Sequence, residues 1–119
     1  MTSPREIAER YWQLEAARDL DGVVRQYHSD ATFRAPGWDL HGHDQIRTYY
    51  EDSARTYPHL EVDIVSEITV GDETALEWEA VLIDPSGGRH PLTGINRIRV
   101  KDGLLYVVHA YFDPAQLNT

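Results

Sequence analysis

Residues 92–113 read LTGINRIRVKDGLLYVVHAYFD, two apolar-rich runs joined by the turn sequence Lys101-Asp102-Gly103. Apolar and polar residues alternate in both runs, as they do in half-buried strands, and an Asp-Gly pair between such runs is typical of a hairpin. The run TALEWEAVLID at 74–84 precedes them and leads into the turn sequence DPSGG at 84–88. We therefore expect three consecutive long strands in an antiparallel meander.

The first half of the chain has helical spacing instead. Ser3-Pro4-Arg5-Glu6 has the pattern of a capping box with proline at the first helical position, which predicts a helix over about residues 4–18. A short second helix is expected between a cap at Asp19 and about His28. A third is expected from Asp44 to about Tyr57, because its apolar residues recur at offsets of three, four and eight and Pro58 follows.

A fourth long strand is expected from about residue 60, where apolar residues alternate with charged ones, and a brief strand at 31–35. Three helices followed by a strongly curved antiparallel sheet indicate an α+β fold in which the helices cover one sheet face. With 119 residues, 41% of them hydrophobic, the chain has room for one core. Residues 1–119 are therefore expected to form a single domain.

The composition argues against several kinds of partner. Asp and Glu number 20 against 11 Lys and Arg, a formal charge of −9 that would repel nucleic acid and anionic membranes. The absence of cysteine rules out disulfides and thiolate metal sites. The N-terminal segment has no apolar signal region, so a soluble, cytoplasmic protein is expected. The pair His41 and His43 lacks strong ligand spacing, and no metal is expected there.

Three segments carry a resemblance to a known family: ERYWQLEAARDLDGVVRQYHSDATF at 9–33, GHDQIRTYYE at 42–51, and the segment at 92–113. With the order of elements, they resemble the nuclear transport factor 2-like superfamily, most of all its SnoaL-like branch, named for polyketide cyclases. The chain is also similar to ketosteroid isomerases and limonene-epoxide hydrolases. The resemblance covers nearly the whole chain and implies a cone-shaped, cystatin-like sheet that encloses a pocket, but it implies no particular reaction.

Ketosteroid isomerases hold an enolate oxygen with a tyrosine and a protonated aspartate. The resemblance places the first donor at Tyr11 and the second at Asn96, whose amide can donate without a shifted pKa. The isomerase base falls at Ala35, which cannot carry a proton. Steroid isomerisation by that mechanism is therefore not expected.

The last strand supplies the expected base. In epoxide hydrolases an aspartate ends this strand, at the position of Asp113, and forms a catalytic triad with two residues of another strand. The positions that match those two residues hold Trp78 and Ala80 in this chain, so the triad is incomplete. SnoaL-like cyclases place an acid/base aspartate at the same position, which makes Asp113 the expected general base. His109 lies two residues earlier, on the same strand face as Asp113, and is expected to orient it or share its proton.

The leading hypothesis is a cofactor-free enzyme that removes a proton next to a carbonyl in a small apolar polyketide-, terpenoid- or steroid-like compound. The alternative is a non-catalytic module that binds an apolar ligand or assists another protein. A homodimer through the outer sheet face is implied by the resemblance. The pocket wall and its mouth are expected to include Trp12, Phe33, Trp38, His41, Tyr50, Trp78 and Tyr111.

Each candidate also has a structural explanation. Tyr11 lies on the apolar face of a helix, where a tyrosine commonly belongs to the core. Asn96 could satisfy the backbone at a strand irregularity. Asp113 precedes Pro114 and could cap a turn. His109 could be a neutral histidine in the core or at a dimer interface.

Overall fold

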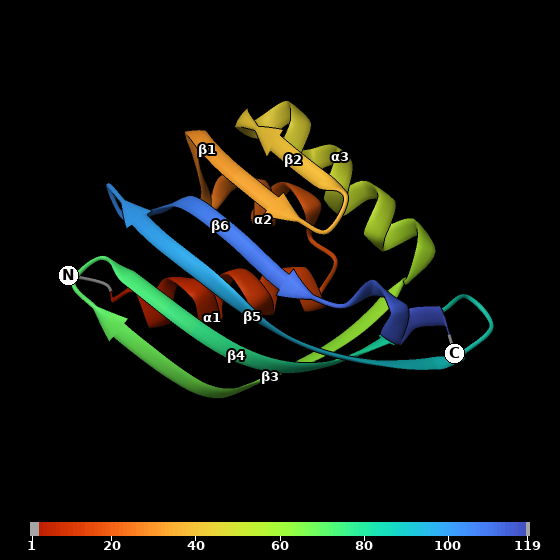
Figure 1. The fold of residues 1–119 in the computed structure, drawn as a ribbon. Helices are drawn as coiled ribbons and strands as arrows, with labels where there is room; N and C mark the ends of the chain where they lie inside the picture. The colour runs from red at the N-terminus through yellow and green to blue at the C-terminus, as the bar shows by residue number, and fades with distance from the viewer. Residues whose placement is uncertain (1–2, 119) are drawn as a thin grey trace.

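The computed structural model of the protein describes residues 3–118. These residues form three α-helices, six strands and a final turn of 3₁₀ helix (Figure 1). The helices are α1 (Pro4–Ala16), α2 (Leu20–Arg25) and α3 (Gly42–Thr56). The strands are β1 (Tyr27–Ala35), β2 (Trp38–His41), β3 (His59–Val70), β4 (Glu73–Ile83), β5 (Arg89–Lys101) and β6 (Leu104–Phe112), and the 3₁₀ turn is η1 (Pro114–Asn118).

The helix starts follow the capping signals of the sequence. The hydroxyl of Ser3 accepts a hydrogen bond from the backbone N–H of Glu6 at 3.1 Å, and the capping box is complete. Asp19 caps α2, with its Oδ1 3.0 Å from the backbone N–H of Gly22. The third helix begins at Gly42, two residues before the predicted start. All three predicted helices are therefore confirmed, but α2 ends at Arg25 and not near His28, which belongs to β1.

The sheet has the order β2-β1-β6-β5-β4-β3. Strands β4 to β6 form the predicted antiparallel meander and β3 extends it, but β1 pairs parallel with β6. The expected brief strand at 31–35 is longer, and the edge strand β2, which was not predicted, follows it. The α+β class is confirmed, while the wholly antiparallel sheet is corrected to a mixed one.

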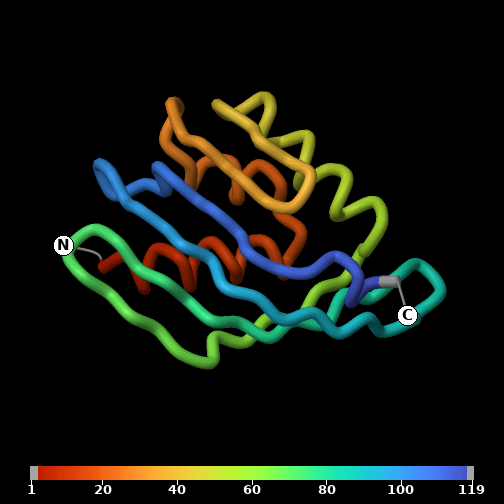
Figure 2. The backbone as a smooth tube through the Cα atoms, in the orientation of Figure 1, coloured from red at the N-terminus to blue at the C-terminus, as the bar shows by residue number. Residues whose placement is uncertain are grey.

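The sheet bends around the helices, which lie on its concave face (Figure 1). The trace in Figure 2 shows β3 and β4 curving past α1. The register of β3 on β4 shifts between Ile64 and Ser66, and that of β5 on β6 shifts between Arg99 and Val100. Such bulges increase the local bend and twist of a strand. The two bulges therefore add to the curvature of the sheet.

The core lies between the helices and the concave face. Its largest fully buried side chains include Tyr27, Tyr50, Ile46, Leu76, Ile98 and Leu105. Within residues 3–118, none of the helices combines the length and apolar character needed to cross a membrane.

Candidate functional site

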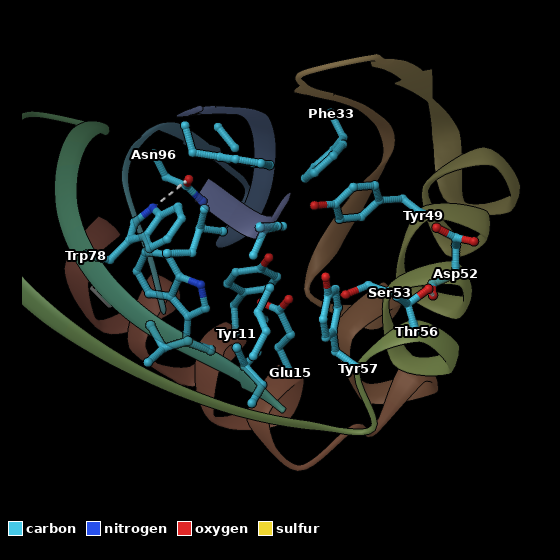
Figure 3. Close-up of a pocket in the computed structure, with 18 residues that line it drawn as sticks. Tyr11, Glu15, Phe33, Tyr49, Asp52, Ser53, Thr56, Tyr57, Trp78 and Asn96 are labelled. Atoms are coloured by element: carbon cyan, nitrogen blue, oxygen red, sulfur yellow. Dashed lines mark hydrogen bonds between the residues drawn. The ribbon is translucent and has the colours of Figure 1, made fainter. Parts of the chain in front are cut away.

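A cavity of about 200 Å³ opens between the helices and the concave face of the sheet (Figure 3). The sheet and η1 contribute mainly apolar side chains, among them Leu60, Val62, Trp78, Leu82, Phe112 and Leu117. The helices contribute most of the polar ones, namely Tyr11 and Glu15 from α1 and Tyr49, Asp52, Ser53 and Thr56 from α3, with Tyr57 just beyond it. The cavity is therefore amphipathic, with an apolar sheet side and a polar helix side.

Strand β6 places its apolar residues, not its polar ones, in this cavity. Ala110 and Phe112 line it, whereas His109 and Tyr111 lie on the opposite, outer face of the strand. Tyr111 is 51% exposed, and its hydroxyl shares a 2.9 Å hydrogen bond with Nδ1 of His109. Their placement corrects the expectation that His109 assists a base in the pocket and that Tyr111 shapes its wall.

The imidazole of His109 faces cationic neighbours on the outer face. Arg34 of β1 and Arg97 of β5 are its register partners. Partial burial lowers the pKa of His109, and the positive charges of Arg34 and Arg97 lower it further. His109 therefore belongs to the electrostatics of the outer face.

Asp113 is exposed and caps the turn that follows β6. Its Oδ1 accepts a hydrogen bond from the backbone N–H of Ala115 at 2.9 Å, and its backbone carbonyl accepts one from Gln116 at 3.1 Å. It does not line the cavity, whereas Leu117 of the same turn does. The expectation of Asp113 as the pocket base is therefore wrong, because Pro114 turns the chain into η1 and the carboxylate stays with the turn.

Tyr11 reaches the cavity at the end of a buried chain of hydroxyls. The hydroxyl of Tyr27 lies 2.6 Å from that of Tyr50, which lies 2.5 Å from that of Tyr11. Burial raises the pKa of all three tyrosines, so each keeps its proton at neutral pH. The two hydrogen bonds among these hydroxyls use two of their three protons. When Tyr27 donates to Tyr50 and Tyr50 to Tyr11, the Tyr11 proton is left for the Glu15 carboxyl or for a ligand in the cavity.

Asn96 presents an amide donor from the opposite wall. It is 4% exposed, and its Oδ1 accepts a 3.0 Å hydrogen bond from Nε1 of Trp78. Because an indole N–H can only donate, the amide oxygen must face Trp78 and the amide nitrogen is left for the cavity. Gly94 makes this arrangement possible, since a Cβ there would lie 2.6 Å from the Trp78 ring.

Glu15 is one of the two carboxyl groups in the lining of the cavity, the other being Asp52. Glu15 follows Tyr11 by four residues on α1, so the two side chains lie on one helix face. Figure 3 shows the oxygen ends of Tyr11, Glu15 and Tyr49 turned toward a common space. Burial raises the pKa of Glu15, while hydrogen bonding with Tyr11 and the positive charge of Arg18 oppose the rise. A carboxyl with a raised pKa next to hydroxyl groups can hold or accept a proton.

The remaining predicted wall residues divide into three groups. Trp12, Phe33 and Trp78 line the cavity as expected. Tyr50 is buried behind Tyr11 and does not reach the cavity. Trp38 packs against Tyr49 at 5.4 Å between ring centroids, and His41 is exposed at the start of α3, so neither lines the cavity.

The sequence reasoning missed the polar residues of the helices, Glu15 among them. A helical signal was available, because Asp52, Ser53 and Thr56 follow Tyr49 at offsets of three, four and seven. The helical spacing of apolar residues alone does not reveal these positions. Polar residues on a core-facing stripe mark the place where a helix borders a cavity.

The charged groups in the described lining are the carboxyl groups of Glu15 and Asp52, with no Lys, Arg or His. The part of the chain from 3 to 118 brings together no group of three or more side chains able to hold a metal ion. The cavity thus offers hydrogen-bond donors and carboxyl groups inside a largely aromatic and aliphatic wall.

The family model of the SnoaL-like domain matches residues 8–108. No curated protein matches the sequence. Among solved structures, a putative SnoaL-like polyketide cyclase from Shewanella putrefaciens has a TM-score of 0.87 at 11% identity, and the match covers 99% of this chain and 84% of that chain. An NTF2-like protein of unknown function from Burkholderia pseudomallei has a TM-score of 0.84 at 17% identity, with 98% and 95% covered.

A third similar structure is a hypothetical protein with a ketosteroid isomerase-like fold from Catenulispora acidiphila, solved in complex with trimethylamine. Its TM-score is 0.85 at 15% identity, with 98% of this chain and 91% of its own covered. At these identities the structures share a fold, the NTF2-like cone, and nothing finer. The match of the family model to most of the sequence places the chain in the SnoaL-like domain family.

Proposed function

We propose that this protein is a small-molecule enzyme that moves a proton next to a carbonyl group, with Glu15 as its general acid/base. The observation that carries the proposal is the Glu15 carboxyl in the cavity, beside the Tyr11 hydroxyl and with a raised pKa. A general base works best when its pKa approaches the working pH, and burial moves a carboxyl in that direction. Asp113, the base expected from the sequence, has no such environment.

Two neutral donors support the second half of the mechanism. The Tyr11 hydroxyl and the amide N–H of Asn96 both belong to side chains that line the cavity, and Tyr11 can turn its proton to a ligand once Glu15 has been protonated. When Glu15 takes a proton from the carbon next to a carbonyl, the electron pair moves onto the carbonyl oxygen. Donors already in place stabilise that charge. In a substrate with a C=C bond conjugated to the enolate, return of the proton to the far end of the dienolate gives isomerisation, and attack of the enolate carbon on a second carbonyl gives ring closure.

The lining also favours a particular class of substrate. A cavity of about 200 Å³ is smaller than the roughly 300–1,000 Å³ typical of pockets for drug-sized ligands. Its apolar sheet side suits a hydrocarbon ring system, and its carboxyl groups disfavour an anionic ligand. We therefore expect an uncharged carbonyl compound of one or two rings, terpenoid- or polyketide-like, rather than a whole steroid.

Hydrogen exchange tests this proposal without knowledge of the natural substrate. Uncharged cyclic ketones such as β-tetralone and indanone are incubated with the protein in D₂O, and loss of the signals of the protons next to the carbonyl is followed by proton NMR. We expect wild-type protein to accelerate exchange, and Glu15→Gln to lower the rate by about 10²-fold or more. Asp113→Asn is the matched control and should exchange at the wild-type rate.

Equal rates for Glu15→Gln and wild type would contradict the role of Glu15. Loss of activity in Asp113→Asn with activity kept in Glu15→Gln would restore the assignment made from the sequence. The same experiment addresses the second candidate, a non-catalytic module, which the exposed turn position of Asp113 favours. That candidate predicts binding of β-naphthol, a stable mimic of the tetralone enol, with no acceleration of exchange by any variant. The expected homodimer stays a prediction.

A further inference from the structure

Arg18 carries buried polar atoms that have no partner among residues 3–118. It lies in the turn between α1 and α2 with a left-handed φ of 55°. Its Nη2 donates a 2.6 Å hydrogen bond to the backbone carbonyl of Tyr57, while Nε and Nη1 are buried and unpartnered. A guanidinium stays charged at any ordinary pH, and buried donors without acceptors are costly. The position therefore calls for an explanation beyond one hydrogen bond.

The guanidinium runs behind the polar side of the cavity. The backbone N–H of Arg18 donates to the carbonyl of Glu15 at 2.9 Å, and the side chain ends at Tyr57. Both Glu15 and Tyr57 line the cavity, whereas Arg18 does not. The positive charge is thus attached to the wall next to Glu15 but is kept out of the space that a ligand would fill.

Among the other groups that face Glu15, the Tyr11 hydroxyl stabilises a negative charge on it by a hydrogen bond, but none of them carries a positive charge. Tyr11 from α1, Tyr27 from β1, and Tyr49 and Tyr50 from α3 are neutral tyrosines whose pKa values the Glu15 charge raises. Asp52 of α3 adds a further negative charge beside Tyr49. Within residues 3–118, Arg18 is the cation that acts on Glu15, and it also favours the ionised form of Tyr49.

We propose that Arg18 is a positioning residue that lets the Glu15 carboxyl ionise inside an otherwise non-cationic pocket. Burial alone favours the neutral acid, which cannot remove a proton from a substrate. The Arg18 guanidinium, which does not line the cavity, adds stabilisation to the Glu15 carboxylate without itself binding the substrate. The inference rests on the proposed function, because that function requires Glu15 to exist in both charge states.

The experiment is a direct titration of Glu15. Protein labelled with ¹³C at the glutamate carboxyl is titrated by NMR, and the Glu15 signal is assigned by its absence in Glu15→Gln. In Arg18→Gln, which keeps a donor but removes the charge, we expect the Glu15 pKa to rise by about one unit or more. In Arg18→Lys, which keeps the charge, we expect most of that rise to be absent. Arg10→Gln, an exposed change on the same helix, is the matched control and should leave the titration unchanged.

An unchanged Glu15 titration in Arg18→Gln would overturn the proposal and leave Arg18 as a tie between α1 and Tyr57. Equal shifts in the Gln and Lys variants would also overturn it, because the effect would then follow shape rather than charge. If Arg18→Gln does not fold, citrulline at position 18 keeps the shape of the side chain without its charge and allows the same measurement. The titration needs no substrate. If ketone exchange fails while Arg18→Gln raises the Glu15 pKa as expected, the proposed enzyme activity is contradicted and the role of Arg18 stands. If ketone exchange proceeds while the Glu15 titration is unchanged in Arg18→Gln, only the role of Arg18 is contradicted.

Discussion

The space between α1 and the sheet, and the outer side of the sheet, hold the same chemical groups in opposite environments. On the inner side, the Tyr11 hydroxyl ends a buried chain and Glu15 borders a cavity; on the outer side, Tyr111 is half exposed and Asp113 caps a turn. Burial raises the pKa of Tyr11 and Glu15. The difference teaches that neither a tyrosine nor a carboxylate is a functional candidate until its side of the sheet is known.

The largest expected effect concerns stability on the two faces of β6. Leu105 is fully buried, so Leu105→Ala should lower the free energy of unfolding by about 2–5 kcal/mol through lost burial and the cavity left behind. Tyr111→Ala on the outer face should cost less than about 1 kcal/mol. Urea unfolding of both variants measures the contrast. Equal losses would mean that the outer face of β6 is itself covered.

The second contrast concerns the two tyrosines in the ketone exchange reaction. Tyr11→Phe removes a donor to the developing oxyanion and should lower the exchange rate by about 10²–10³-fold. Tyr111→Phe should have no effect, because its hydroxyl lies on the other face of the sheet. A normal rate in Tyr11→Phe would reduce this residue to a core tyrosine.

The smallest effect is the pH dependence of stability that Glu15 contributes. The pKa of Glu15 is raised above its ordinary value of 4.5 in the folded protein, so the folded state binds its proton more tightly than the unfolded state. Stability should therefore fall as the pH rises from 4.5 to the folded pKa, by about 1.4 kcal/mol for each pH unit in that window. Glu15→Gln should not show this loss, so its stability relative to wild type should increase as the pH rises.

Urea unfolding at several pH values between about 4 and about 8 measures this gain. A Glu15→Gln curve that stays parallel to wild type would show that Glu15 has an ordinary pKa in the folded protein.

Local signals in the sequence predicted the elements well, and the reason is that each signal acts over a few residues. Ser3 and Glu6 form their capping box, Asp19 caps α2, and the turn at Asp102 and Gly103 joins β5 to β6. The parallel pairing of β1 with β6 has no such signal. It joins residues such as Arg34 and His109, which are far apart in the chain and meet only once the sheet has formed.

The candidate site was harder to predict because it depends on which face of a strand turns inward. Alternation in β6 separates His109 and Tyr111 from Ala110 and Phe112, but it leaves open which pair borders the cavity. The polar side chains of His109 and Tyr111 suggested a site by their chemistry, but Ala110 and Phe112 are the pair that lines the cavity. Glu15 was missed because a charged residue on a helix is usually exposed, and only the space left beside Tyr11 makes this one different.

Gly94 has a consequence for how this pocket could change over evolution. With no side chain there, the Trp78 ring rests against the backbone of β5 and holds the amide of Asn96 in one orientation. A larger residue at position 94 would shift the ring and release the amide at the same time. New ligand preferences would therefore have to arise on α3 and η1, whose side chains can vary without disturbing the donor that Trp78 orients.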